Sequence, residues 1–540
     1  MASAQASTAR TPNVGRASGI MFLSLVLSRF LGIARDMVMA HQFGSNATTD
    51  AYRLAFQIPD LLFFLIAGGA LSSAFIPVFS EYLHTERERE AWHIFSVVTS
   101  LMSLIILGFI GLAWVFSTPI LQALAPGRMD SAELITRMSH IILPAQFAFF
   151  IGGLMFGTLY ARQVFAVPGL GPNVYNLGII FGAVVISHFV SPGVVGMSWG
   201  ALIGAFIGNL IIPFYAMRKL GSHFSFTLDL KHPGVKKVFK LMLPVVLGLS
   251  LPGVYGVLMQ RFGSLYQPGV NTWLDYGNKL MQAPLGIFGQ SLAIAVFPAL
   301  SEFYAKGSMH QFRLQLATTI RTVLYLTIPI SVFMALEPHA IVGALYQSGK
   351  FKPEDTQVVA QMLSYFSIGI CAWCLHPVLM RGFFAIHNSV SPIVQGTITT
   401  VIFFFLAKFL SSQTPLSYFG LPLASSLSAI ILVVMLILSV RRAIGGLDIR
   451  GILLTLCKSA VASVVIVVIC LGLNNSPVYD IALHHRIGMI AFVGFTFVMS
   501  TSAYYAVSRA LGMKEAEYAR KGANRGNLRA QAEPTVETDD

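Results

Sequence analysis

Long apolar segments recur along almost the entire chain, and this recurrence limits the fold more than any other feature of the sequence. A helix needs about 20 mostly apolar residues to cross a bilayer. In hydrocarbon the backbone has no water to bond, so a single segment of this length must be helical. The sequence therefore predicts an all-α integral membrane protein with about fourteen transmembrane helices. The expected spans are residues 17–40, 51–80, 92–117, 134–160, 170–190, 194–216, 236–262, 272–301, 313–336, 356–384, 390–411, 418–440, 452–473 and 485–509.

Charged residues are scarce and unevenly placed. Only 11% of the 540 residues are charged and 55% are hydrophobic, whereas a soluble domain carries about 25% charged residues. This composition excludes a soluble protein. The net charge of +13 is concentrated in alternate loops and in the tail, as expected when Lys and Arg mark the cytoplasmic side. We therefore expect both termini in the cytoplasm and no nucleic-acid partner.

Motifs for nucleotide, metal or redox chemistry are lacking in the sequence. There is no P-loop and no HExxH string, so no ATP-hydrolysing or zinc-peptidase module is expected. Cys371 and Cys374 form a CxxC pair without a second ligand pair, which favours two small apolar residues over a metal or redox site. We therefore expect no cofactor, no metal and no catalytic residue.

Two segments six spans apart share a spacing of Asp, Gln and Pro. The matching positions are Asp50, Gln57 and Pro59 in one segment and Asp275, Gln282 and Pro284 in the other. The strings PVFSEY and PALSEF follow them in the same order. Because the two copies are six spans apart, they have the same orientation in the membrane. This predicts two six-helix lobes related by a pseudo-two-fold axis along the membrane normal. The expected divisions are a cytoplasmic lead at 1–16, an N-lobe at 17–220, a C-lobe at 235–441, two extra helices at 450–510 and a disordered cytoplasmic tail at 511–540.

Buried charge in the first span is the strongest functional signal. Arg29 lies near the middle of the span, and Arg35 and Asp36 follow it. An arginine at the centre of a membrane helix costs about 2.5–3.5 kcal/mol on insertion scales, so it normally faces a cavity or a partner. Asp36 lies seven residues after Arg29 and shares its face. Two interpretations stay open, namely an anion-binding site and a structural Arg–Asp pair.

Further polar residues extend this pattern. Asp275 and Lys279 are four residues apart, so they form either a salt bridge or a second cationic wall, and Gln282 follows one turn later. Asp50 follows Thr49 where the second span begins, and an N-cap would explain it. Asp60 is an intramembrane acid without an evident partner in the sequence, which makes it a candidate for ion coupling.

Several of these strings resemble the MurJ/MviN family of lipid II flippases, in the multidrug/oligosaccharidyl-lipid/polysaccharide exporter superfamily. The resemblance runs from about Ser18 to the last span and is carried by strings that include SRFLGIARD, TDAY, IPDLLF, GGALSSAFIPVFSEY, LMQAPLGIFGQSLAIAVFPALSE and LYQSGKF. It implies fourteen helices, a flippase rather than an enzyme, and a bacterial cytoplasmic membrane location. The implied role is in peptidoglycan synthesis, and hence in cell-wall biogenesis and cell shape. The implied partners are lipid II, membrane lipids and the cell-wall synthesis machinery.

The family's cationic central cavity is thought to receive the pyrophosphate of lipid II. Carried over by position, the substrate-binding residues are Arg29, Arg35, Lys279 and Gln282, and the supporting residues are Asp36, Asp50 and Asp275. The chain departs from some members, which have arginine where Phe63 or Phe64 stands here and arginine at the position of Lys279. A lysine offers a point charge instead of a bidentate fork.

The functional expectation is a flippase that moves the lipid-linked precursor from the inner to the outer leaflet by alternating access. An alternative is a cation-coupled exporter of drugs or of other polyprenyl-linked oligosaccharides. A membrane glycosyltransferase is a third hypothesis, but it needs a clustered acidic motif at the outer face. The outer loops hold only scattered acids, Glu337 among them.

Overall fold

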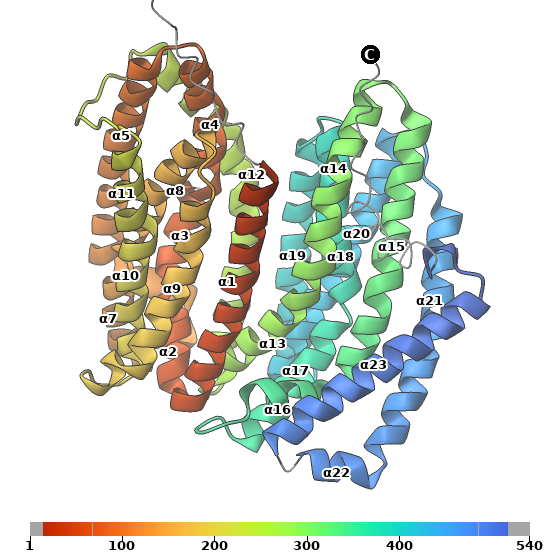
Figure 1. Cartoon of the computed structure of the whole chain (residues 1–540). Coiled ribbons are helices and arrows are strands. Elements are labelled where there is room, and N and C mark those ends of the chain that lie inside the picture. The colour runs from red at the N-terminus through yellow and green to blue at the C-terminus, as the bar shows by residue number, and fades with distance from the viewer. Residues whose placement is uncertain (1–13, 67, 484, 517–540) are drawn as a thin grey trace, which may run out of the picture. The chain divides into compact units, whose positions relative to one another are not determined.

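The structure is a computed structural model of the whole chain (Figure 1). It describes residues 14–66, 68–483 and 485–516; within these ranges, the side chains of 14–20, 22, 64–66, 68–73 and 243–253 are outside the description. All regular elements in this part of the chain are helices. The expected all-α class is therefore confirmed.

The chain divides into two compact units. Unit 1 comprises Met1–Thr272 together with Gly349–Phe351, and unit 2 comprises Trp273–Ser348 together with Lys352–Asp540. Helix α12, which the repeat assigns to the C-lobe, packs against α3 and α4 in unit 1. The repeat predicts which helices correspond to one another in sequence. The lobe boundaries drawn from it stay a prediction.

Unit 1 contains the helices up to α12 and the first turn of α13. Their bounds are α1 Val14–Phe43, α2 Ala47–Ala55, α3 Gln57–Ile66, α4 Gly68–His84, α5 Glu88–Val115, α6 Ser117–Leu124, η1 Pro126–Ser131, α7 Ala132–Ile142, α8 Ala145–Ala161, α9 Ala166–Val184, η2 Ile186–His188, α10 Val195–Ala205, η3 Phe206–Ile211, α11 Ile212–Lys219 and α12 Pro233–Ser264.

Unit 2 contains most of α13 and the helices that follow it. Their bounds are α13 Val270–Pro284, η4 Leu285–Gly289, α14 Gln290–Ala305, α15 Met309–Leu336, α16 Pro338–Tyr346, α17 Pro353–Ser367, α18 Ile370–Ala385, α19 Val390–Ser412, η5 Ser417–Phe419, α20 Gly420–Ala443, α21 Ile449–Asn474, α22 Pro477–Leu483 and α23 Arg486–Ala510.

Many of these helices are long and apolar enough to span a membrane. Among the described residues, 10 helices are long and apolar enough to cross a bilayer, and 11 if α17 and α18, bent by 47°, form one broken span. All of them coincide with expected spans. The other three expected spans are also helical, as α1, as the series α2–α4 and as α12. Their crossing of the membrane stays a prediction.

Two breaks in the helices fall at prolines, whereas α4, α14 and α15 continue through Pro77, Pro298 and Pro329. The chain bends between α7 and α8 at Pro144, and α13 ends at Pro284 with the π-helical turn η4. Proline removes a backbone donor and clashes with the preceding turn, so the ladder must shift or break there. The span that holds Asp50 and Asp60 is also divided, into α2, α3 and α4, with Pro59 inside α3 and Pro77 inside α4.

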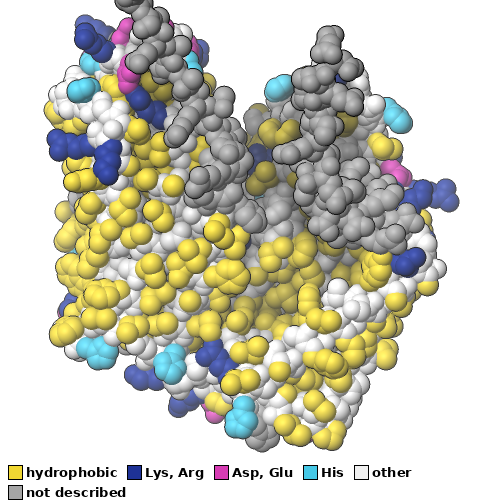
Figure 2. Space-filling view, viewed as in Figure 1, with side chains coloured by type: hydrophobic (Ala, Val, Ile, Leu, Met, Phe, Trp, Pro, Cys, Tyr) yellow, Lys and Arg dark blue, Asp and Glu magenta, His cyan; other side chains and the backbone are white. Residues whose placement is uncertain are grey.

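Apolar side chains lie on the outside of the units as well as in their interiors. In unit 1 a buried cluster built on Phe75, Phe79 and Trp92 packs α4, α5 and α8 together. Large apolar side chains such as Leu107, Phe181 and Ile211 are nevertheless exposed. Figure 2 shows hydrophobic side chains over the middle of the visible face, with Lys and Arg toward its ends. This surface suits a hydrocarbon solvent.

Candidate functional site

Charged side chains of α1 and α2 meet within unit 1. Asp36 is 3% exposed and accepts from Arg35 Nε and Nη2 at 3.3 Å and from Arg53 Nη2 at 3.4 Å. Arg35 Nη1 also donates to Asn176 Oδ1 of α9 at 3.1 Å. We call Arg35, Asp36, Arg53 and Asn176 the α1 charge cluster. One buried carboxylate thus serves two guanidinium groups, which lowers the cost of keeping both in an apolar helix bundle.

Asn176 fixes the orientation of this cluster. Its amide nitrogen donates to the carbonyl oxygen of Ser28 at 3.3 Å and to that of Pro172 at 3.0 Å. The amide oxygen is thereby turned toward Arg35. Polar side chains that bond across membrane helices are stabilising because hydrocarbon offers no competing water. The cluster therefore joins α1, α2 and α9 in one arrangement.

Arg29 stands apart from this cluster. Its side chain is exposed, and among the described residues it has no ion pair or side-chain hydrogen bond. Of the two interpretations left open, the structural Arg29–Asp36 pair is thus not formed in this part of the structure, where Asp36 contacts Arg35 and Arg53 instead. Arg35 is adjacent to Asp36 in the sequence, and Arg53 reaches it from α2.

Asp50 is fully buried, and it does not cap its own helix. The N-cap of α2 is Asn46, whose side chain accepts from Thr48 N at 3.0 Å. Asp50 instead accepts from Gly269 N at 2.7 Å and from Thr272 N and Oγ1 at 2.8 and 2.7 Å. These donors surround the first turn of α13. The N-cap explanation of Asp50 is therefore wrong, because the carboxylate satisfies the start of another helix.

The expected pair in unit 2 is formed. Lys279 Nζ lies 2.9 Å from Asp275 Oδ2, and both side chains are partly buried. Gln282, one turn later, is exposed. Of the two alternatives for this pair, the geometry is that of an i,i+4 salt bridge. Asp50 and Asp275, which occupy matching positions in the predicted repeat, thus have different partners.

Two other predicted positions lie on the surface of unit 1. Asp60, in the first turn of α3, is exposed and lies near Tyr175. Phe63 is 37% exposed and packs against Phe150, with ring centroids 5.8 Å apart. The side chain of Phe64 lies outside the described residues. The role of Asp60 in ion coupling stays a prediction.

Three further polar residues belong to these contacts and were not predicted. Arg53 and Asn176 complete the α1 charge cluster, and Arg128, which lies between the expected spans 92–117 and 134–160, is 4% exposed and lies 3.4 Å from Asp50 Oδ2. Arg53 stands three residues after Asp50 in an apolar span, which is a signal that could have identified it. Asn176 and Arg128 carry no such signal, because their partners are distant in the sequence.

An apolar cavity of about 200 Å³ lies in unit 2 beside the last long helices. It lies between α15, α21 and α23 and is lined mainly by aromatic and aliphatic side chains, among them Phe333, Ile466, Phe497 and Tyr504. Tyr504 donates to the carbonyl oxygen of Tyr325 at 2.9 Å, which ties α23 to α15. This mainly apolar lining suits an apolar chain.

Comparison with known proteins places the chain in a family. The sequence profile of the family described as "Lipid II flippase MurJ" matches residues 39–489. The chain is 29% identical over 432 residues to the probable lipid II flippase MurJ of Vibrio cholerae, covering 76% of this chain and 80% of that protein. It is 25% identical over 386 residues to the lipid II flippase MurJ of Burkholderia cenocepacia, covering 68% and 72%.

Solved structures show the same fold. The inward closed conformation of a lipid II flippase MurJ matches with a TM-score of 0.75 at 24% identity, over 90% of this chain and 98% of the other. An inward-facing MATE family multidrug transporter of the MOP superfamily matches with a TM-score of 0.65 at 14% identity, over 79% and 98%. The chain is a multi-pass membrane transporter, not an enzyme, and it belongs to the lipid II flippase MurJ family.

Proposed function

We propose that this chain carries lipid II from the inner to the outer leaflet of a bacterial cytoplasmic membrane by alternating access. Membership of the flippase family supports this substrate. The observation that carries the proposal is the exposed guanidinium of Arg29, which has no ion pair among the described residues. A cation in the middle of a membrane helix needs water or an anion nearby, and a pyrophosphate provides the anion.

The proposed substrate-binding residues are Arg29, Arg35, Lys279 and Gln282. A guanidinium offers forked N–H donors that match phosphate oxygens, and such charge-assisted bonds are strong. Asp36, Asp50 and Asp275 have supporting roles: each binds a cation or a helix start and thereby fixes where the neighbouring donors point. With Lys279 in place of arginine, this position contributes charge but no bidentate geometry.

The polyprenyl tail requires an apolar surface, and the cavity between α15, α21 and α23 provides one in unit 2. We assign the tail to this surface. The chain has no P-loop, so energy comes from an ion gradient or from the membrane potential, with Asp60 as the coupling candidate. Both termini lie in the cytoplasm in this proposal.

Complementation of a flippase-depleted bacterium tests the proposal. The parent chain should restore growth and clear lipid II from the cytoplasmic side, whereas Arg29→Ala should leave lipid II accumulated at an unchanged protein level. Arg441→Ala, at an exposed arginine that ends α20, is the matched control and should complement fully. Normal lipid II transport by Arg29→Ala would refute the anion-site role. Failure of the parent chain to clear lipid II, with the chain present in the membrane, would favour an exporter of another substrate.

A further inference from the structure

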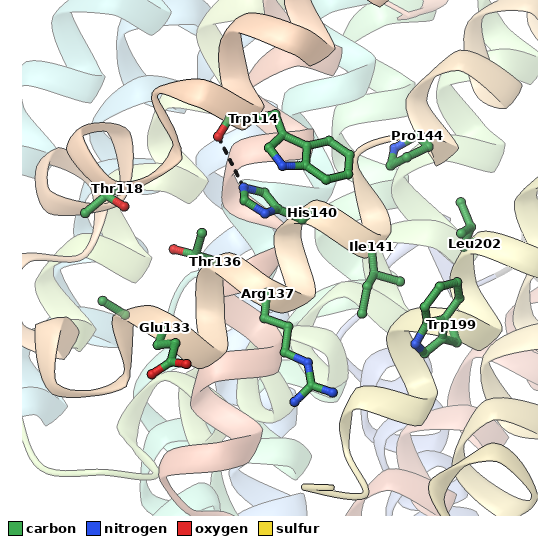
Figure 3. A pocket seen from close by; sticks show the side chains of 11 residues that line it. Trp114, Thr118, Glu133, Thr136, Arg137, His140, Ile141, Pro144, Trp199 and Leu202 are labelled. Carbon is green, nitrogen blue, oxygen red and sulfur yellow. Dashed lines mark hydrogen bonds between the residues drawn. The ribbon is translucent and has the colours of Figure 1, made fainter. Parts of the chain in front are cut away.

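Unit 1 contains a pocket of about 860 Å³ on the side of α7, apart from the α1 charge cluster (Figure 3). Its walls come from the end of α5, from α6, from α7 and from α10. The residues that matter for its chemistry are Trp114, Glu133, Thr136, Arg137, His140 and Trp199. A carboxylate, a guanidinium, an imidazole and two indole rings thus line one space.

The two tryptophans place this pocket at a membrane–water interface. Trp114 is the penultimate residue of α5 and is 46% exposed, and Trp199 of α10 is 41% exposed. Tryptophan is enriched where headgroups meet hydrocarbon. In the predicted topology α5 runs outward from its basic start, so this end of α5 lies at the outer leaflet.

The polar groups of the pocket have unused bonding capacity. Arg137 is exposed and donates from Nη1 to the carbonyl oxygen of Ser191 at 3.0 Å. Glu133 lies one turn earlier on α7, yet no ion pair between the two is formed within the described residues. The hydroxyl oxygen of Thr136 is buried without a hydrogen-bond partner in the same part of the chain. In Figure 3 the guanidinium of Arg137 lies between Glu133 and Trp199.

One wall of the pocket is held in place by ring stacking and hydrogen bonds, and another wall is apolar. The His140 ring stacks on Trp114, with centroids 4.6 Å apart and planes at 23°. His140 Nε2 also lies 3.2 Å from the Trp114 carbonyl oxygen and 3.1 Å from Ser117 Oγ. Ile141, Pro144 and Leu202 complete the lining. A ligand here would meet a rigid aromatic wall, a polar side and an apolar surface.

We propose that this pocket binds an outer-leaflet phospholipid whose headgroup carries both a phosphate and a primary ammonium group, as in phosphatidylethanolamine. The phosphate accepts from the exposed guanidinium of Arg137, and the ammonium donates to the exposed carboxylate of Glu133. The carboxylate of Glu133 and the guanidinium of Arg137 are not paired with each other, so together they match the two charges of a zwitterion. An anionic headgroup would instead leave Glu133 facing a like charge. The acyl chains lie over Ile141 and Leu202. This lipid site is separate from the proposed substrate site.

Native mass spectrometry of the full chain tests the proposal. The protein is released from mixed micelles that contain equal amounts of phosphatidylethanolamine, phosphatidylglycerol and phosphatidylcholine of identical acyl chains. We expect phosphatidylethanolamine to be retained at least fivefold over each competitor. Phosphatidylcholine is the informative competitor because it carries the same charges but no N–H donors. Equal or preferred retention of phosphatidylglycerol would overturn the proposal in favour of a simple anion site.

Variants locate the binding. Arg137→Gln should reduce phosphatidylethanolamine retention at least fivefold, and Glu133→Gln should abolish its preference over phosphatidylglycerol. Arg441→Gln is the matched control and should behave as the parent. If Arg137→Gln fails to fold, the Arg137→Lys variant and the comparison of lipids bound to the parent chain still test the proposed site. Unchanged retention in a folded Arg137→Gln variant would show that the lipid binds elsewhere.

Discussion

At the scale of single residues, Asp36 is the side chain on which the α1 charge cluster depends. It is 3% exposed and contacts both Arg35 and Arg53. Removing one partner of a buried ion pair leaves an uncompensated charge, and this usually costs more than the pair contributed. Arg29, being exposed and outside the cluster, has no such structural role.

The first prediction contrasts these two residues. Asp36→Asn should destabilise the protein by about 3 kcal/mol, because two guanidinium groups then share a neutral amide. Arg29→Ala should leave stability within about 0.5 kcal/mol of the parent, as for other exposed sites. Thermal unfolding in detergent measures both. Equal melting temperatures for Asp36→Asn and the parent would mean that the cluster does not support the fold.

Glu337 is a second residue whose environment is unusual. It follows the last residue of α15, is 1% exposed, and neither carboxylate oxygen has a hydrogen-bond partner among the described residues. Burial raises the pKa of this carboxyl to about 7, and the neighbouring Cys470 and Asn474 offset only part of that rise. The folded protein therefore favours the neutral acid, while the unfolded chain titrates near the ordinary value.

The second prediction follows from the direction of this shift. A carboxyl with a raised pKa in the folded state stabilises fully below its ordinary pKa, and that contribution disappears as the pH rises through 7. One pKa unit corresponds to about 1.4 kcal/mol, so from pH 5 to pH 8 the parent should lose ~2 kcal/mol more than Glu337→Gln. Melting curves at both pH values give the comparison. Parallel losses in parent and variant would assign the pH dependence to other groups.

At the scale of elements, α9 and α10 pack through glycines spaced four residues apart. Gly178 and Gly182 of α9 face Gly196, Gly200 and Gly204 of α10. A Cβ built at Gly200 would lie 2.2 Å from the Gly178 carbonyl oxygen, and one built at Gly182 would lie 2.3 Å from the Gly196 carbonyl oxygen. Small residues let membrane helices approach closely and gain backbone contact. This contact holds α9, which carries Asn176, in place.

The third prediction tests this contact. Gly200→Ala should destabilise by about 1–3 kcal/mol, because the added methyl group meets backbone that cannot yield without moving a helix. Gly111→Ala on α5 is the control, since a Cβ there meets nothing within 4 Å. Alanine is about 1 kcal/mol better than glycine inside a helix, so this control should be neutral or stabilising. A Gly200→Ala variant as stable as Gly111→Ala would show that the two helices can separate freely.

At the scale of the whole molecule, the distribution of charge predicts the orientation in the membrane. The start of α12 is rich in lysine, and α20 ends in Arg441 and Arg442. Both segments are expected on the cytoplasmic side. The short connections at the other ends of the helices, such as that after α19, carry few cations.

The fourth prediction concerns this topology. In a chain whose four cysteines have been replaced, a cysteine at Ser412 should react with an impermeant maleimide in intact cells. A cysteine at Ser222 should react only after permeabilisation. Ser412 is the last residue of α19, and Ser222 lies in the connection that follows α11. The reverse pattern of labelling would invert the orientation and with it the proposed direction of transport.

The sequence by itself determined the class of the molecule. Apolar segments long enough to span a bilayer can only be helices, and this follows from local composition alone. Prolines alone do not locate the breaks, because α4, α14 and α15 continue through Pro77, Pro298 and Pro329. The Asp275–Lys279 pair was predictable, since both residues lie on one face of a single helix. The resemblance of local strings also indicated the family that the comparisons show.

Only the tertiary structure decided which buried charges meet. Asp36 takes Arg53 from another helix, Asp50 binds the start of α13, and Glu337 has no cation beside it within the described residues. Helical periodicity relates positions on one helix, but it does not determine which faces of different helices meet. Each buried ionic group must nevertheless find a partner or change its protonation. Its partner is therefore determined by packing between helices that are far apart in the sequence.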